Sequence, residues 1–269
     1  MKGLLTNFLE ATVVIAAVGA AALAGRFLDL RGAGAAAVLG YLIYIFGGRM
    51  HFLLLLVFFI VSGFSTRYRY REKYGEYGRG VRTWSNVISN GLAAALIATA
   101  GYFLNDPSTA LPLYVGAVSA VFADTMSTEL GLLSKRPPIL ITSLKRTEPG
   151  TPGGVTPLGL MSAFVTGFII TATIFLYTGF SAATLPFNKV VLVSVFSGFT
   201  GSLFDSVVGG LVQSRYRCTV CGRAVEVKKH CGKMTLYLGG SRLINNDLVN
   251  LLTSFYGAFS AYSLWVFLG

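Results

Sequence analysis

The sequence predicts an all-α fold, a polytopic membrane helix bundle of about eight transmembrane helices that forms one integral-membrane domain over residues 1–269. Hydrophobic residues make up 54% of the chain and charged residues only 12%, whereas about a quarter of a soluble domain is usually charged. The mean hydropathy is +0.65. Long apolar runs separated by short polar loops complete the pattern that is typical of membrane-spanning helices.

The apolar runs predict the helices in chain order. The first run contains Glu10 and lacks a convincing cleavage site, so we interpret it as a retained helix rather than a signal peptide. Several runs are rich in glycine and alanine, which let helices approach closely. The second and third are short for a full span. The expected helices cover roughly residues 4–25, 32–48, 50–65, 86–104, 110–133, 157–179, 188–211 and 246–268.

The positions of the basic residues predict the orientation. Most of the 22 lysines and arginines fall near residues 26–31 and in the loops 66–83, 134–156 and 212–244. An even number of helices places these loops on one side, and the positive-inside rule makes that side cytoplasmic. We therefore expect a protein of the cell membrane with both termini outside and its active site on the cytoplasmic face. The net charge of +11 then needs no nucleic acid partner.

The loop 66–83 alternates basic residues with tyrosines, which suits a segment that lies on anionic headgroups. A second interpretation stays open, in which some of its arginines also hold a substrate phosphate.

Polar residues recur at the predicted cytoplasmic ends of four helices. A polar group inside a membrane helix is costly, and hydrogen bonding between helices explains many single cases. Three aspartates at one depth, however, predict a shared pocket. The residues concerned are Asn86 and Asn90, then Asp124 and Thr128, then Ser202, Asp205 and Ser206, and finally Asn246, Asp247 and Asn250.

A glycine-rich loop, EPGTPGG over residues 148–154, leads directly into Thr156 and Pro157. Threonine is a good helix N-cap and proline is favoured at the first helical position. The amides at a helix N-terminus, together with close approach over glycines, can bind phosphate. The chain has no G-x-x-x-x-G-K-[ST] sequence, so this loop is not a P-loop.

The cysteines predict a zinc site in the loop 212–244. Cys218, Cys221 and Cys231 are the three cysteines of the chain, and they lie near His230 in a CxxC–HC arrangement. One structural Cys3His site would use all four side chains. Unligated thiols are the alternative, because adjacent ligands at 230 and 231 are unusual.

Four motifs resemble a known family. ADTMSTELG, ITSLKRTEPGTPGGVT, GSLFDSVVGGLVQ and NNDLVNLLTS, in this order, resemble the integral-membrane family of plant phytyl-phosphate kinase and transmembrane protein 19. The central motif is similar to that of CTP-dependent dolichol and phytol kinases, at Asp124, Gly131, Lys145, Gly150 and Thr151. The resemblance implies transfer of the γ-phosphoryl group of CTP, or of another nucleotide, to an isoprenyl monophosphate lipid, which gives the diphosphate. It does not include the CxxC–HC insertion.

Phosphoryl transfer needs positioning and charge neutralisation rather than a strong base when the acceptor is already an anion. We therefore expect Asp124, Asp205 and Asp247 to bind Mg2+. Asp124, Lys145 and Asp205 are the expected catalytic residues, and Glu129 is expected to be peripheral. The remaining phosphate-binding candidates are Arg146, Gly150, Thr151, Gly153, Gly154, Thr156, Asn86, Asn90 and Asn246.

Two other functions fit parts of the pattern. A cytidylyltransferase that forms a CDP-lipid would use similar groups but release diphosphate. A membrane transporter also carries intramembrane aspartates and glycine-rich helices. A transporter would be expected to carry charged residues across the whole membrane depth, whereas the polar residues here gather at one end.

Overall fold

The computed structural model describes residues 2–75, 80–179 and 186–269, and it places a helix at each of the predicted apolar segments. A short additional helix, α4 (Tyr70–Tyr74), lies in the basic loop, of which residues 76–79 are outside the described part. The long helices are α1 (Lys2–Ala24), α2 (Leu30–Leu42) with a π-helical extension (Ile43–Gly47), α3 (Arg49–Arg67), α5 (Trp84–Phe103), α6 (Pro107–Gly131), α7 (Pro157–Thr178), α8 (Phe187–Val212) and α9 (Asn246–Phe267).

Within the described residues, seven helices are long and apolar enough to cross a membrane. Helix α9 is not among them, although it has 22 residues. Its first half carries Asn246, Asp247, Asn250 and Thr253, which lower its hydropathy. It nevertheless packs along α6, α8 and α5 as part of the same bundle.

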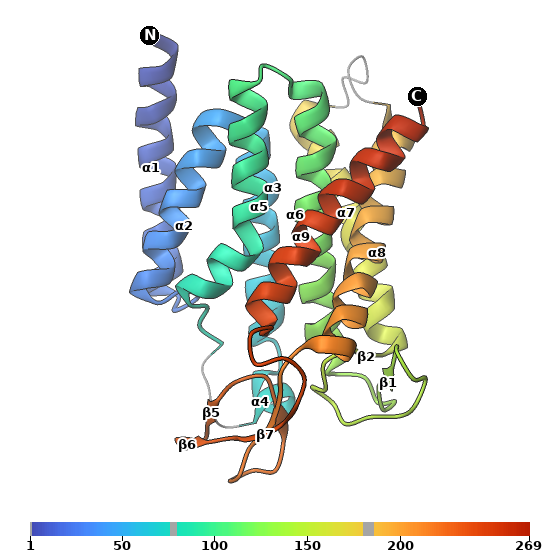
Figure 1. The fold of residues 1–269 in the computed structure, drawn as a ribbon. Helices are drawn as coiled ribbons and strands as arrows, with labels where there is room; N and C mark the ends of the chain where they lie inside the picture. Colours follow the sequence, from blue (N-terminus) through green and yellow to red (C-terminus); the bar gives the residue numbers. More distant parts are fainter. Residues whose placement is uncertain (1, 76–79, 180–185) are drawn as a thin grey trace.

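Helix α6 is the centre of the bundle, and Figure 1 shows it surrounded by the other helices. It packs against α9, α8, α7, α5 and α3, and every residue from Tyr114 to Ala123 is buried. Tyr114 and Phe122 on this helix are fully buried. The polar stretch that follows α6 therefore begins at a helix that neighbouring helices hold on several sides.

Glycines allow the central helices to touch at the backbone. A Cβ atom added to Gly116 of α6 would lie 2.2 Å from the carbonyl oxygen of Gly257 on α9. A Cβ atom on Gly201 of α8 would lie 2.5 Å from the Cβ of Ala120 on α6. Such contacts are the small-residue packing that membrane bundles use, and they fix α8 and α9 against α6.

The two ends of the bundle differ. Figure 1 shows both chain termini at one end, and α4, the strands and the long basic loops at the other. This arrangement agrees with an even number of passes through the bundle. It also gathers the predicted site residues at the end that carries the loops.

The all-α expectation is incomplete in these loops, because short antiparallel strands form there. β1 pairs with β2, β3 lies between β4 and β7, and β5 pairs with β6. The strands are β1 (Ile139–Leu140), β2 (Gly154–Val155), β3 (Arg215–Arg217), β4 (Ala224–Val225), β5 (Lys229–His230), β6 (Lys233–Met234) and β7 (Leu236–Gly239).

Candidate functional site

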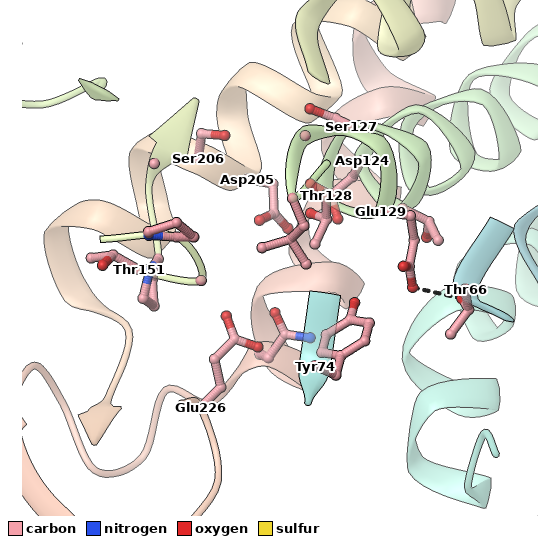
Figure 2. A pocket seen from close by; sticks show the side chains of 18 of the residues that line it. Thr66, Tyr74, Asp124, Ser127, Thr128, Glu129, Thr151, Asp205, Ser206 and Glu226 are labelled. Carbon is pink, nitrogen blue, oxygen red and sulfur yellow. Dashed lines mark hydrogen bonds between the residues drawn. The ribbon is translucent and has the colours of Figure 1, made fainter. Parts of the chain in front are cut away.

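A polar cavity of about 370 Å³ lies at the end of the bundle that carries the loops. Its walls come from the ends of α5, α6, α8 and α9, from the glycine loop, from the basic loop around α4, and from the 212–244 loop. Figure 2 shows the carboxylates of Asp124, Asp205 and Glu226 directed toward this space. Residues far apart in the sequence thus supply one site.

Asp124 and Asp205 meet because of the packing of α6 against α8. Ala120 and Gly201 are the contact point of the two helices, and each aspartate follows its contact residue by four positions. Four residues are about one helical turn, so both side chains leave the same interface. Thr253 of α9 donates a hydrogen bond of 3.0 Å from its hydroxyl to Oδ2 of Asp205. None of the ion pairs among the described residues involves either aspartate.

Asn250 provides independent evidence for a ligand. This residue is only 8% exposed and lines the cavity. Its Oδ1 atom has no hydrogen-bond partner among the described residues. A buried polar atom without a partner is costly. The oxygen donors of Asp124, Asp205 and Asn250 are the type of ligand that Mg2+ takes in proteins, so the residues present fit that ion.

Glu226 was missed by the sequence analysis. It lies in the 212–244 loop and lines the cavity opposite the aspartates (Figure 2). Gln213 donates a hydrogen bond of 3.0 Å to its Oε1 atom. Burial, with a smaller contribution from the charge of Asp205, raises the pKa of Glu226 from its ordinary 4.5 to about 7. The one sequence feature that could have indicated Glu226 is that it is the single acidic residue in a basic loop.

The glycine loop lies directly against α8 and faces the cavity. Gly153 has a φ of +81°, and a Cβ atom there would lie 2.6 Å from the Cα of Gly210. Only glycine permits this conformation and this contact. The loop thus presents backbone rather than side chains. The predicted residues that line the cavity here are Gly150, Thr151, Gly153, Gly154 and Thr156.

Thr156 begins α7 as predicted. Its hydroxyl accepts a hydrogen bond of 3.1 Å from the amide of Gly159, and Pro157 occupies the first helical position. The hydroxyl of Thr151 instead donates to the carbonyl of Glu148 within the loop. Both hydroxyls therefore have structural partners, and Thr156 is the residue at the start of α7 that lines the cavity.

Three of the predicted asparagines, Asn86, Asn90 and Asn246, also line the cavity. Asp247 does not line it. The carboxylate of Asp247 accepts hydrogen bonds from the Ser85 hydroxyl at 2.5 Å and from Nδ2 of Asn86 at 3.1 Å. This carboxylate therefore connects α9 to α5. We expected it to bind magnesium, but it lies outside the cavity.

Lys145 and Arg146 also lie outside the cavity, unlike the prediction. Both are exposed, and the carbonyl of Lys145 accepts from the amide of Leu140 across a tight turn. Because β1 pairs with β2, the segment between them folds outward and carries both basic residues to the surface. Arg146 instead lines a neighbouring surface groove with Arg215 and Arg217.

Glu129 is buried rather than peripheral. Its Oε2 atom lies 2.5 Å from Nζ of Lys73, whose side chain is fully buried. Its Oε1 atom accepts a hydrogen bond of 2.6 Å from Thr66, the contact drawn in Figure 2. This cluster fixes α4 to the end of α6. Tyr70 and Tyr74 of α4 line the cavity, so the ion pair positions one of its walls.

The predicted zinc ligands come together. One ligand atom from each of Cys218, Cys221, His230 and Cys231 lies within 4.8 Å of the others. Cys231 has a φ of +50°, and this left-handed backbone lets the adjacent His230 and Cys231 face one centre. The amides of Val220 and Cys221 approach the Cys218 sulfur at 3.4 and 3.5 Å, which is a common outer shell of metal-bound thiolates. The four groups fit a tetrahedral Zn2+ site.

Comparison with known proteins gives one family and several relatives. The family model described as "Integral membrane protein DUF92" matches residues 13–258. Protein PGR of Arabidopsis thaliana is 31% identical over 258 residues, which cover 86% of this chain and 88% of that protein. An uncharacterized membrane protein of Methanocaldococcus jannaschii is 32% identical over 191 residues, 71% of this chain and 76% of the relative. No solved structure matches this chain.

Proposed function

The chain belongs to the DUF92 family of integral membrane proteins, and from this premise we propose that it is a phosphotransferase that moves the γ-phosphoryl group of CTP to an isoprenyl monophosphate. The observation that carries the proposal is the cavity toward which Asp124 and Asp205 both point (Figure 2). Asn250 also lines it, and its buried Oδ1 atom has no hydrogen-bond partner in the described part of the chain. Acidic and amide oxygens that share one cavity with a glycine loop suit a magnesium-bound nucleotide. The choice of CTP rests on the resemblance of the 124–156 motifs.

In this proposal the protein positions two phosphates rather than activating a nucleophile. Asp124, Asp205 and Asn250 hold Mg2+, with Glu226 close by. The amides of the 150–154 loop hold the nucleotide phosphates. Bound magnesium would neutralise negative charge and so reduce the repulsion between the acceptor phosphate and the nucleotide phosphates.

The transfer balances without a general base. An oxygen of the acceptor monophosphate attacks the γ-phosphorus of CTP, the bond to the β–γ bridging oxygen breaks, and CDP leaves with that electron pair. The acceptor oxygen is already anionic, so no proton must be removed first. Asp124 and Asp205 therefore act by charge and position, and the walls made by α4 and the 212–244 loop keep bulk water away.

Two further parts of the proposal concern the loops. The 212–244 loop binds one structural Zn2+ through Cys218, Cys221, His230 and Cys231, because the four ligand atoms already converge. The end of the bundle that carries the basic loops faces the cytoplasm of the cell, where CTP is available, because of the positive-inside rule.

The test uses purified protein in lipid nanodiscs with a panel of isoprenyl monophosphates and CTP labelled at the γ- or at the α-phosphate. We expect the γ-label in a lipid diphosphate and no lipid product from the α-label. Transfer of the α-label to lipid would identify a cytidylyltransferase and refute the kinase. An absence of any labelled lipid across the panel, with folded protein, would also refute it.

A further inference from the structure

The wall of the polar cavity beside α5 continues into an apolar groove. Arg82, Asn86 and Asn90 line both the polar cavity and a second cavity of about 80 Å³. The rest of that second cavity is apolar and is formed by residues of α2, α3 and α5. The polar cavity and the apolar cavity therefore adjoin at these three residues.

A third cavity, also of about 80 Å³, adjoins the second cavity. It shares Ala36, Leu55 and Phe59 with the second cavity, and its remaining lining is apolar and reaches α1. We call the two together the α2–α3–α5 groove. Because its walls are helices of the membrane-spanning bundle, its natural occupant is hydrocarbon rather than water.

The space in the groove depends on two small residues that line it. Gly91 of α5 lines it, and a Cβ atom there would lie 2.8 Å from Cδ1 of Leu39 on the facing helix α2. Ala36 lines both of its cavities. Larger side chains at these positions would occupy the space that the groove offers.

Arg82 lies where the polar cavity meets the groove. Its backbone is fixed, because its amide donates to the carbonyl of Phe27 and its carbonyl accepts from the amide of Asp29. Its guanidinium lies 5.5 Å from the centre of the Phe58 ring. Among the described residues its side chain makes no ion pair. Desolvation lowers the pKa of Arg82, and the charge of Glu129 partly offsets this effect.

Resting on the proposed function, we propose that the α2–α3–α5 groove binds the hydrocarbon chain of the isoprenyl monophosphate and that Arg82 binds its phosphate. From the polar end, the order is the cavity of about 370 Å³, then Arg82, then the narrow apolar groove. That order matches an amphiphile whose anionic head must meet a second phosphate. Arginine is well suited to such a head because its planar donors pair with phosphate oxygens.

The groove also indicates a single chain. Its two cavities adjoin at Ala36, Leu55 and Phe59 and are each only about 80 Å³, so we expect them to accept one hydrocarbon chain and not two side by side. A diacyl lipid such as phosphatidic acid carries a similar phosphate but two chains. The groove is thus expected to separate isoprenyl phosphates from the phospholipids that surround the protein.

Binding is tested without turnover. The probe is geranylgeranyl monophosphate with a diazirine on its chain, added to the full-length protein in nanodiscs without nucleotide, and the labelled peptides are identified by mass spectrometry. We expect labels on α2, α3 and α5. Ala36→Phe should lower labelling about tenfold, as filling a packed site does, and Arg82→Gln should lower it as well.

The matched control is Ala35→Phe, which adds the same side chain one position earlier on α2. Ala35 does not line the groove. It should label like the wild type. Thermal unfolding checks the fold of each variant. If Ala36→Phe does not fold, the pair Ala36→Leu and Ala35→Leu makes the same comparison with a smaller change.

Three results would overturn the proposal: labels confined to other helices, equal labelling of wild type and the Ala36 variant, or equal competition by phosphatidic acid and unlabelled geranylgeranyl phosphate. These outcomes are separate from the fate of the proposed function. A chain that binds the probe in the groove but transfers no phosphoryl group would keep the groove and refute the kinase. A chain that transfers the γ-phosphoryl group but is labelled elsewhere would do the reverse.

Discussion

At the scale of single residues, the structure gives Glu129 and Lys73 a role that the sequence did not predict. Their side chains are 7% and 0% exposed and form an ion pair between α6 and α4. A charge that loses its partner inside a protein destabilises the fold far more than an exposed one does. The pair therefore matters first for the position of α4, which carries Tyr70 and Tyr74 to the cavity wall.

Glu129→Ala should lower the free energy of unfolding by about 3–5 kcal/mol, because it leaves the Lys73 ammonium buried and unpaired. The double variant Glu129→Leu with Lys73→Met should recover much of that loss. Glu72→Gln breaks an exposed pair with Arg69, both about half exposed, and should cost about 1 kcal/mol or less. Thermal unfolding in detergent measures all three. A single Glu129 variant as stable as Glu72→Gln would contradict the assigned burial.

The same scale shows what single residues reveal in a sequence. Asp124 and Asp205 could be predicted, because a carboxylate in an apolar helix has few reasons to be there. Lys145 could not be placed, because its direction is set by the pairing of β1 with β2, which involves two residues in each strand. Glu226 could not be found either, since it reaches the cavity only through the fold of its loop.

At the scale of elements, the long helices were predictable from hydropathy. The backbone N–H and C=O groups of each apolar run must form hydrogen bonds inside the membrane, and a helix provides them. The short strands were not, because segments of two to four residues have no periodicity to detect. Helix contacts were predictable only in kind. Glycine and alanine indicated close packing, but not that Gly116 meets Gly257 or that Gly201 meets Ala120.

Gly257→Leu should disturb the site through the helices. A side chain at this position would meet the Cβ of Ala120 at 2.3 Å and the carbonyl of Gly116 at 2.5 Å. It would push α9, with Asn250 and Thr253, away from Asp205. Overpacking of this kind costs about 1–3 kcal/mol or more, and phosphoryl transfer should fall with it. Gly34→Leu, where a Cβ would meet nothing within 4 Å, is the control. Equal melting temperatures of the two variants would count against the contact.

The zinc loop gives a second prediction at this scale. Metal analysis should find about one zinc per chain, and Cys218→Ser should lose it. Because the site is closed, the first effect should be faster proteolysis within 212–244. Since Glu226 lies on this loop, binding of Mn2+ in place of Mg2+ should then weaken. A Cys218→Ser protein with full zinc content would rule out this set of ligands.

At the scale of the whole molecule, the sequence predicted that the basic loops share one side, and Figure 1 shows them at one end of the bundle, away from both termini. The membrane side itself is tested by labelling single cysteines with an impermeant reagent. Cysteines placed at Tyr68 and Ser143, in a protein whose native cysteines hold zinc, should react from the cytoplasm. A cysteine at Ser108 should react from outside. Any loop that reacts from the wrong side would contradict this topology.

Helices α6, α8 and α9 bring Asp124, Asp205 and Asn250 to one cavity, which we propose is a site for a metal-bound nucleotide. Each residue alone has an ordinary explanation in hydrogen bonding between helices. If their common position serves phosphoryl transfer, substituting them should lower the rate of that reaction more than the stability of the protein.

The most direct measurement is the rate of γ-phosphoryl transfer to an isoprenyl monophosphate by wild type, Asp124→Asn and Asp205→Asn, compared at equal amounts of folded protein. Asparagine keeps the size of aspartate, so folding should survive while the charge that faces the metal is lost. We expect each variant to be slower by about 10²-fold or more, as is common when one preorganised electrostatic contact is removed. Equal rates in all three proteins would contradict the account.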